Sequence, residues 1–506
     1  MNSYLLNRSQ GSVSSSAFHV AHNAHLIRSI EPAPGLRFSS HPAAPALNQG
    51  ESEPTEDGWK GEEQDELRAH KAGVNVLTID QYEKRFMVSG GADASVHLWD
   101  LETRGSESSH LYKSIASVTK RAHRLSRSTD PSAHTHALTS ISIYPFDPTP
   151  STILTTSHDT TLKLSSLQAP TIVPVYTFSL HSTPYSHSFS SHPSSLLLTA
   201  VGTSDKTVRL LDLRSGLATH ALPGHSAAVL SVSWAPHHEY LLASASNDNR
   251  VILFDVRRGG HNSALASLDM DDAVGVIAPH DAPSSFSCRN PFVPGARAHN
   301  GAVTGVRWTS NGSHIITSGH DARIRVWDAS TGANSLVHFG PRIRNSSSLH
   351  LAERAPLVLP SDITGAVLDT LLWPNYGDQD DRGEIFMFAL RDGTFIKRLN
   401  VPGVPSSRQK MRGKPTALSA ARINGLAWRG SGGSGEGMEL FSAHGDGTIR
   451  AWVSRTADEE HEIAEEEEEM EDKKRKRDVL DEVYRGLMNR NVTFTRFTMG
   501  ETRVIF

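Results

Sequence analysis

Residues 299–328 read HNGAVTGVRWTSNGSHIITSGHDARIRVWD and contain three short segments in which apolar and polar residues alternate. The segments VTGVRW, IITSGHD and RIRVWD are separated by residues typical of turns, chiefly Gly, Asn, Ser and Asp. Alternation with a period of two, interrupted by such turns, is the pattern of short antiparallel strands. This stretch therefore predicts a small β-sheet that begins after a histidine and ends at Trp-Asp.

The same pattern recurs along the middle of the chain. Residues 70–100 and 225–255 repeat the order of histidine, two alternating segments, turn aspartate and third segment. Weaker copies bring the number of units to seven, and they lie at 138–165, 196–212, 345–400 and 423–452. A repeat of about 40 residues is typical of propellers. One such sheet cannot bury both of its faces alone, so the units are expected to stack radially around a channel. The sequence predicts an all-β fold, a seven-bladed β-propeller over residues 67–455.

The motif GH…WD, present as GHSAAVLSVSW and IRVWD, resembles the WD40 family. The resemblance implies that the His, Ser/Thr, Asp and Trp of one unit form a hydrogen-bonded chain that ties its strands together. The matching residues are His70, Ser89, Asp93, Trp99, His225, Asp248, His299, Thr317, Asp321, Trp327, Asp446 and Trp452. A hydrolase triad uses similar residue types, but a catalytic site is unique whereas this set recurs. We therefore expect a protein that is not an enzyme, with no catalytic residue, metal or cofactor.

Composition narrows the class of protein further. The single cysteine, Cys288, suits a reducing compartment, and no apolar stretch reaches the roughly 20 residues that span a bilayer. Residues 458–477 hold eleven acidic and five basic side chains, so the rest of a chain with net charge −5 is nearly neutral. A near-neutral body argues against direct binding of nucleic acid, and we expect no direct, sequence-specific nucleic-acid partner and no membrane partner.

Residues 1–35 are expected to form a helix-loop-helix segment. Tyr4, Leu5 and Leu6 form an apolar cluster, and Val20 and Ile27 recur at helical spacing within residues 17–30. Two interpretations are open: a helix packed on the propeller, or a docking segment for a groove of a partner. Residues 36–66 are rich in Pro, Gly and acidic residues and predict a disordered linker.

Residues 456–506 are expected to be a charged tail, largely disordered, with a possible helix over 478–490. Its basic run resembles a nuclear import signal and comprises Lys473, Lys474, Arg475, Lys476 and Arg477. The alternative is a charge-balanced helix in which a Glu run precedes a Lys run. We predict a nuclear protein.

Two consecutive units end in Asp-x-Arg, namely Asp212/Arg214 in RLLDLRSG and Asp255/Arg257 in RVILFDVRRGG. The end of a strand accounts for the Asp but not for an Arg two positions later. Because the units are consecutive, both arginines are expected on neighbouring blades of one face. Arginine is favoured in ion pairs and hot spots at interfaces, although each arginine can instead pair within its own blade.

Paired Asp-x-Arg boxes and an N-terminal helix-loop-helix together resemble the WD40 substrate receptors of cullin-4 ubiquitin ligases. The stretches SYLLNRSQG, RFMVSGGADASVHLWDLE and VGTSDKTVRLLDLRSG are similar to the Cockayne syndrome group A family. The resemblance implies that residues 1–35, Asp212, Arg214, Asp255 and Arg257 dock on the triple-propeller adaptor of the ligase. It also implies a role in transcription-coupled nucleotide excision repair, with a repair ATPase of the Cockayne syndrome group B type and stalled RNA polymerase II as partners. The alternative is a nuclear WD40 scaffold for chromatin or RNA-processing complexes.

Overall fold

The computed structural model describes most of the repeat region and part of the N-terminal segment. Tyr4, Leu5, Leu6, most of the expected linker and the tail with its basic run Lys473–Arg477 lie outside the described residues. The described residues are Ser9, Gly11, 14–40, 68–105, 109–119, 133–147, 149–168, 171–190, His192, 197–258, 260–272, 296–345, 353–359, 369–375, 383–402, 422–430 and 437–455.

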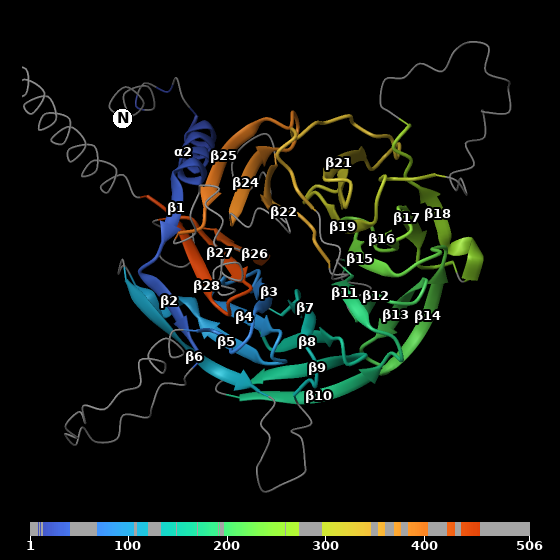
Figure 1. The fold of residues 1–506 in the computed structure, drawn as a ribbon, viewed down its shortest axis with the longest axis horizontal. Helices are drawn as coiled ribbons and strands as arrows, with labels where there is room; N and C mark the ends of the chain where they lie inside the picture. Colours follow the sequence, from blue (N-terminus) through green and yellow to red (C-terminus); the bar gives the residue numbers. More distant parts are fainter. Residues whose placement is uncertain are drawn as a thin grey trace, which may run out of the picture. The chain divides into compact units, whose positions relative to one another are not determined.

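These residues form seven β-sheets arranged around a centre, which confirms the predicted seven-bladed propeller (Figure 1). Blades 1 and 2 contain β3 (Val74–Ile79), β4 (Phe86–Gly91), β5 (Val96–Asp100), β6 (His110–Val118), β7 (Leu138–Ile143), β8 (Thr152–Ser157), β9 (Thr161–Gln168) and β10 (Thr171–Ser179). Blades 3 and 4 contain β11 (Pro184–Phe189), β12 (Leu198–Thr203), β13 (Thr207–Asp212), β14 (Leu217–Pro223), β15 (Val229–Trp234), β16 (Leu241–Ser246), β17 (Val251–Asp255) and β18 (Ala264–Ser267). Blades 5, 6 and 7 contain β19 (Val303–Trp308), β20 (His314–Gly319), β21 (Arg323–Asp328), β22 (Leu357–Leu359), β23 (Thr370–Pro374), β24 (Glu384–Ala389), β25 (Phe395–Asn400), β26 (Ile423–Gly430), β27 (Glu439–His444) and β28 (Ile449–Ser454).

The hydrophobic core lies between neighbouring blades. The middle strands are covered on both faces, so β17 reads as a continuous run, VILFD, in which every residue is buried. Between blades 4 and 5, Val251 and Ala243 pack with Val303 and Trp327. Because every sheet is sandwiched in this way, a blade depends on both neighbours for burial of its apolar side chains.

The N-terminal segment closes the ring, which the sequence did not predict. Strand β1 (Ile30–Ala33) pairs antiparallel with β28 and becomes the fourth strand of blade 7. Strand β2 (Leu36–Ser39) pairs parallel with β6 as a fifth strand of blade 1. Residues 36–39, assigned above to the linker, therefore belong to the propeller. Phe38 shows why: its ring stacks on Tyr112 at 4.6 Å and is fully enclosed.

Helix α2 (Ser15–Ser29) precedes β1 and packs on the propeller. Leu26 and Ile27 are buried in the core between blades 6 and 7, beside residues such as Met387 and Trp452. The Lys397 ammonium group donates hydrogen bonds to the carbonyls of Arg28 and Ile30, at 2.7 and 2.9 Å. Because Ile27 is only 4% exposed, we correct its assignment from partner contact to core packing.

Short 3-10 helices follow two of the third strands, at η1 (Leu101–Arg104) and η3 (Gly260–Ser263). Arg104, the last residue of η1, pairs with Glu439 of blade 7 at 2.7 Å, and Glu439 also pairs with buried Arg429 at 2.6 Å. These ion pairs join the first and last blades. The N-terminal segment joins the same two blades, because β1 pairs with blade 7 and β2 pairs with blade 1. Within the described part of the chain, no helix is long and apolar enough to cross a membrane.

Candidate protein-interaction site

The strands of a blade alternate in direction, and this places the two sets of predicted residues on opposite faces. Turns between second and third strands, such as 247–250 and 320–322, lie on what we call the upper face. Turns between third and fourth strands, such as 213–216 and 256–263, lie on the lower face. The turn aspartates of the predicted hydrogen-bonded chain lie on the upper face, and the Asp-x-Arg pairs lie on the lower face.

Blade 5 shows the predicted hydrogen-bonded chain in full. Nδ1 of His299 lies 2.9 Å from Asp321, and its Nε2 lies 2.8 Å from the Thr317 hydroxyl. The indole Nε1–H of Trp327 donates to the same hydroxyl at 2.9 Å. Arg325 adds an ion pair with Asp321 at 2.7 Å. Burial opposes ionisation of Asp321, but these contacts outweigh it and hold the pKa of the carboxyl well below its usual range.

Blade 1 repeats the arrangement with one change. His70 lies 2.7 Å from the hydroxyl of Ser89, to which Trp99 also donates at 2.9 Å. Asp93 lies farther from the histidine, at 3.4 Å, and the hydroxyl of Ser95 lies between them, 2.7 Å from His70 Nδ1. The additional hydroxyl therefore relays the contact that is direct in blade 5.

The other blades depart from the pattern. In blade 4, His225 contacts Asp248 at 3.1 Å and Ser244 at 2.7 Å, and Phe254 replaces the indole donor. Burial opposes ionisation of Asp248, but its bonds with His225 and with backbone N–H groups lower the pKa to about 2.

In blade 7, Asp446 accepts from Thr448 rather than from a histidine, and Trp452 donates to Ser442, which contacts His444. Blade 2 holds a pair that the sequence reasoning missed, His134 and Asp159 at 2.9 Å. The histidine lies four residues before the first strand, which was the available signal.

Two further histidines make stability depend on pH. Burial lowers the pKa of both His97 and His187 to about 3. A histidine that is neutral when folded but has an ordinary pKa of about 6.5 when unfolded destabilises the fold as pH falls below 6.5. The loss continues until the folded-state pKa, near 3, and each such group contributes up to about 1.4 kcal/mol per pH unit.

We therefore predict that His97→Phe flattens the decline in the free energy of unfolding between pH 6.5 and 4.5, as measured by urea denaturation. The ring of His97 lies 4.7 Å from His70 and 5.8 Å from Trp99, so an aromatic replacement keeps this packing. His220→Phe, at an exposed position, is the control. An unchanged slope in the His97→Phe variant would show that this ring does not carry the effect.

The pair of blade 4 is rigidly held on the lower face. Arg257 donates to both carboxylate oxygens of Asp255, from Nε at 3.0 Å and from Nη2 at 2.9 Å. Its guanidinium also lies over the ring of Tyr240, with 4.6 Å between its carbon and the ring centroid. Arg258 approaches the same carboxylate at 3.5 Å. The hydrogen bonds from Arg257 lower the pKa of Asp255. Arg257 therefore pairs within its blade, as the alternative above expected, yet its side chain remains 62% exposed.

The pair of blade 3 differs. Asp212 accepts from the backbone N–H of Arg214 at 2.9 Å and shapes the turn. Among the described residues, the guanidinium of Arg214 forms no hydrogen bond or ion pair, and the residue is exposed. One face thus presents two arginines on adjacent blades, one fixed by its aspartate and one available to an outside acceptor.

Helix α2 lies on the same face, because Ile30 pairs with Ser454, the last residue of a third strand. It belongs to the blade 7 side, however, across the ring from β14 and β18 (Figure 1). Val20 is partly exposed and remains available, whereas Ile27 is not. The structure therefore brings Arg214 and Arg257 to neighbouring blades and separates them from the helix.

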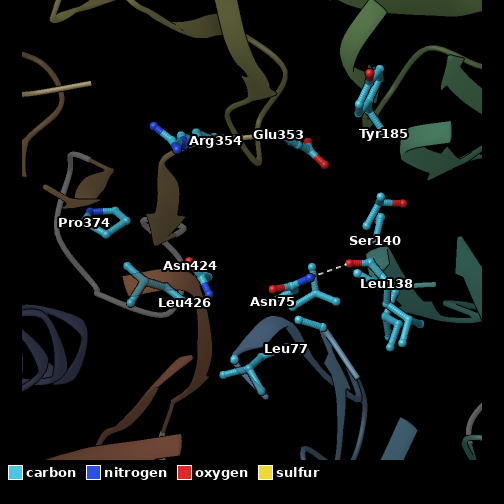
Figure 2. Close-up of a pocket in the computed structure, with 18 of the residues that line it drawn as sticks. Asn75, Leu77, Leu138, Ser140, Tyr185, Glu353, Arg354, Pro374, Asn424 and Leu426 are labelled. Carbon is cyan, nitrogen blue, oxygen red and sulfur yellow. Dashed lines mark hydrogen bonds between the residues drawn. The ribbon is translucent and has the colours of Figure 1, made fainter. Parts of the chain in front are cut away.

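The central channel contains a cavity of about 790 Å³, lined by innermost strands (Figure 2). Asn75 donates to the carbonyl of Leu138 at 2.8 Å, and Asn424 donates to the carbonyl of Val74 at 2.7 Å. Glu353 pairs with Arg307 at 2.9 Å and accepts from Ser231 at 2.8 Å. These contacts join blade 1 to blades 2 and 7, and they join the segment before β22 to blades 4 and 5, so the polar groups around the channel hold the ring together.

Comparison with known proteins agrees with this architecture. The family described as WD domain, G-beta repeat matches residues 61–100, 126–164, 216–255 and 292–328. The chain is 29% identical to the WD repeat-containing protein ATCSA-1 of Arabidopsis thaliana, over 57% of this chain and 73% of that protein.

Two other relatives are named for ribosome biogenesis and for the cell division cycle rather than as plain WD repeat proteins. The chain is 32% identical to the ribosome biogenesis protein YTM1 of Podospora anserina, over 52% of this chain and 54% of that protein. It is 24% identical to cell division cycle 20.1, cofactor of APC complex, of Arabidopsis thaliana, over 49% and 59%. The chain thus spans little more than half the length of these two relatives. No enzyme family is indicated. With four segments matched by the WD domain model and seven sheets closed into a ring, the chain carries WD40 repeats and forms a seven-bladed β-propeller.

Proposed function

We propose that the chain is a non-catalytic substrate receptor of a cullin-4 ubiquitin ligase, acting in transcription-coupled nucleotide excision repair in the nucleus. In this role the lower face docks on the triple-propeller adaptor of the ligase. The remaining surface presents a substrate, such as a repair ATPase at a stalled RNA polymerase II. The chain acts by raising the effective concentration of the substrate near the ubiquitin-loaded enzyme.

The arrangement of Arg214 and Arg257 carries the proposal. The two arginines project from equivalent turns of adjacent blades, where a single acidic or carbonyl-rich surface of a partner reaches both. Asp255 and Tyr240 hold Arg257 in one orientation, so little side-chain entropy is lost when a partner binds. A fixed, exposed arginine next to an aromatic ring is typical of an interface hot spot.

The comparisons support the WD40 propeller that this role requires. The matched plant protein carries the name ATCSA-1, and the match extends over 73% of its length. The N-terminal motif SYLLNRSQG, on which the resemblance also depends, lies largely outside the described residues and contributes as sequence alone.

A nuclear scaffold is the second candidate, and the similarity to YTM1 favours it. A ribosome biogenesis scaffold would assemble with pre-ribosomal particles, and it would have no need of paired arginines on one rim. Recovery of pre-ribosomal particles rather than ligase subunits with the tagged chain from nuclei would select this candidate.

We predict that Arg214→Ala combined with Arg257→Ala weakens binding to the purified adaptor at least about tenfold, because hot-spot arginines each contribute more than about 1 kcal/mol. Binding is measured by biolayer interferometry. Arg323→Ala, an exposed arginine on the upper face, is the matched control and should bind like the unchanged chain. Equal adaptor binding by the double variant and the control would refute the receptor role. A fall of many degrees in the melting temperature would instead assign both arginines to the stability of their blades.

A further inference from the structure

Exposed apolar side chains gather on the outer strands of blades 2 and 3. Ten large apolar residues are exposed among the described residues, and four of them belong to β10 and β14. They are Val173 (42%), Val175 (59%), Tyr176 (46%) and Leu217 (65%). We call these four residues the edge patch. Contiguous exposed apolar surface of this kind marks interaction sites more often than isolated residues do.

Contacts show that the edge patch crosses from one blade to the next. The ring of Tyr176 lies against Gly216, so close that a Cβ atom at Gly216 would be 3.0 Å from it. Gly216 has φ +70°, which favours glycine, and it lies between Arg214 and Leu217. Tyr176 is held in place by Phe178, whose ring lies edge-on at 4.8 Å. The edge patch is therefore continuous from β10 to the turn that carries Arg214.

The backbone of β10 also has an open edge. It is the outermost strand of blade 2, and in the described part of the chain it pairs only with β9. Blade 1 shows what such an edge can accept, because β2 lies along β6 as a parallel fifth strand. Pro174 and the bulge between Pro174 and Tyr176 interrupt the edge, which limits indiscriminate pairing. Residues 176–179, where regular pairing with β9 resumes, remain as a short template.

Charge next to the patch selects the ligand. Strands β10 (TIVPVYTFS) and β14 (LATHALP) contain no acidic residue. The exposed guanidinium of Arg214 lies two residues from Gly216 and has no acceptor within the described part of the chain. A carboxylate on the ligand would provide that acceptor.

We propose that the edge of β10 is a docking site for an extended segment of a partner protein, with alternating apolar side chains and a carboxylate at the end near Arg214. The segment adds a fifth strand to blade 2, as β2 does to blade 1. Backbone hydrogen bonds supply affinity, and the edge patch selects the apolar side chains. The site does not rest on the receptor role, although it shares Arg214 with it.

The test is selection of peptides from a random dodecamer display library on the full chain, with counter-selection on a Val175→Asp variant. Enriched peptides are expected to alternate apolar residues and to contain an acidic residue. Their affinity for Val175→Asp should be at least about tenfold lower, because the exposed valine that a bound peptide would cover is replaced by a charge. Leu336→Asp, at a position 62% exposed outside the edge patch, is the control and should bind unchanged.

Hydrogen exchange identifies the mode of binding. The enriched peptide should protect amides of residues 176–179, and methylation of alternate backbone nitrogens in the peptide should abolish both protection and binding. Enrichment that does not depend on Val175 overturns the proposal. Protection of the same amides by concentration-dependent self-association, seen in sedimentation without peptide, would also overturn it by making a second copy the occupant. Adaptor binding by the Val175→Asp variant should stay intact, so failure of the receptor role and failure of this site are distinguishable.

Discussion

Deletion of residues 1–33 is expected to abolish cooperative folding, whereas deletion of residues 1–13 should leave the melting temperature nearly unchanged. The longer deletion removes β1 and with it the outer strand of blade 7. It also removes Leu26, Ile27 and Ile30, which are at most 8% exposed. Burial of each contributes about 1.5–3 kcal/mol, so the loss is about 5 kcal/mol or more before the broken strand pairing. That is comparable with the whole stability of a typical domain.

Differential scanning calorimetry of the two truncated chains checks this prediction. A sharp transition in the chain lacking residues 1–33, at the temperature of the full chain, would show that ring closure does not depend on β1. The result also decides how docking by the N-terminal segment is tested. Only the shorter deletion, which removes Tyr4, Leu5 and Leu6 but keeps α2, separates loss of adaptor contact from loss of the fold.

Asp321→Ala is expected to lower the free energy of unfolding by about 3 kcal/mol or more, because it leaves a buried cation without its partner. Arg325 is 8% exposed and His299 is fully buried, and both lose the carboxylate that they contact at 2.7 and 2.9 Å. Two backbone N–H groups, of Asn300 and Arg323, lose the same acceptor. Urea denaturation at pH 7 measures the change.

Asp205→Ala provides the comparison for this substitution. Asp205 pairs with Arg209 at 2.7 Å with the same spacing of four residues, but its side chain is 46% exposed. Exposed ion pairs contribute less than about 1 kcal/mol, so this variant should remain close to the unchanged chain. Similar losses in both variants would mean that burial is not the source of the effect at Asp321.

The repeat made most of the fold predictable. Each copy repeats the same strand alternation, the same turn and the same His-to-Asp spacing. A chance resemblance to a propeller repeat therefore becomes less probable with every copy. The bonds of His299, Thr317, Asp321 and Trp327 follow from that register, because fixed spacing along paired strands fixes position in space. Blade 6 has none of these residues, and its first strand, β22, was not recognised for that reason.

Residues outside the repeat were less predictable. Ile27 lies on the apolar side of α2, and its spacing along the helix predicts that another surface covers it. The spacing does not show whether that surface belongs to a partner or to the chain itself. Strand β2 is too short, at four residues, to stand out beside a linker of similar polarity. The bidentate bond between Asp255 and Arg257 depends on side-chain rotamers and on Tyr240, fifteen positions before Asp255. Sequence spacing contains no information about such contacts.

The strand that closes the ring is also the first to be synthesised. Strand β1 begins at Ile30, but its partner β28 ends at Ser454. At about 5–20 residues per second, translation separates them by about 20–80 s. During that time the apolar side chains of α2 and β1 lack their blade 7 partners, such as Trp452, and the blades already made form an open arc with an uncovered face at each end. The nascent chain therefore depends on protection from aggregation until its last blade leaves the ribosome, and premature termination anywhere before β28 yields a product that cannot close.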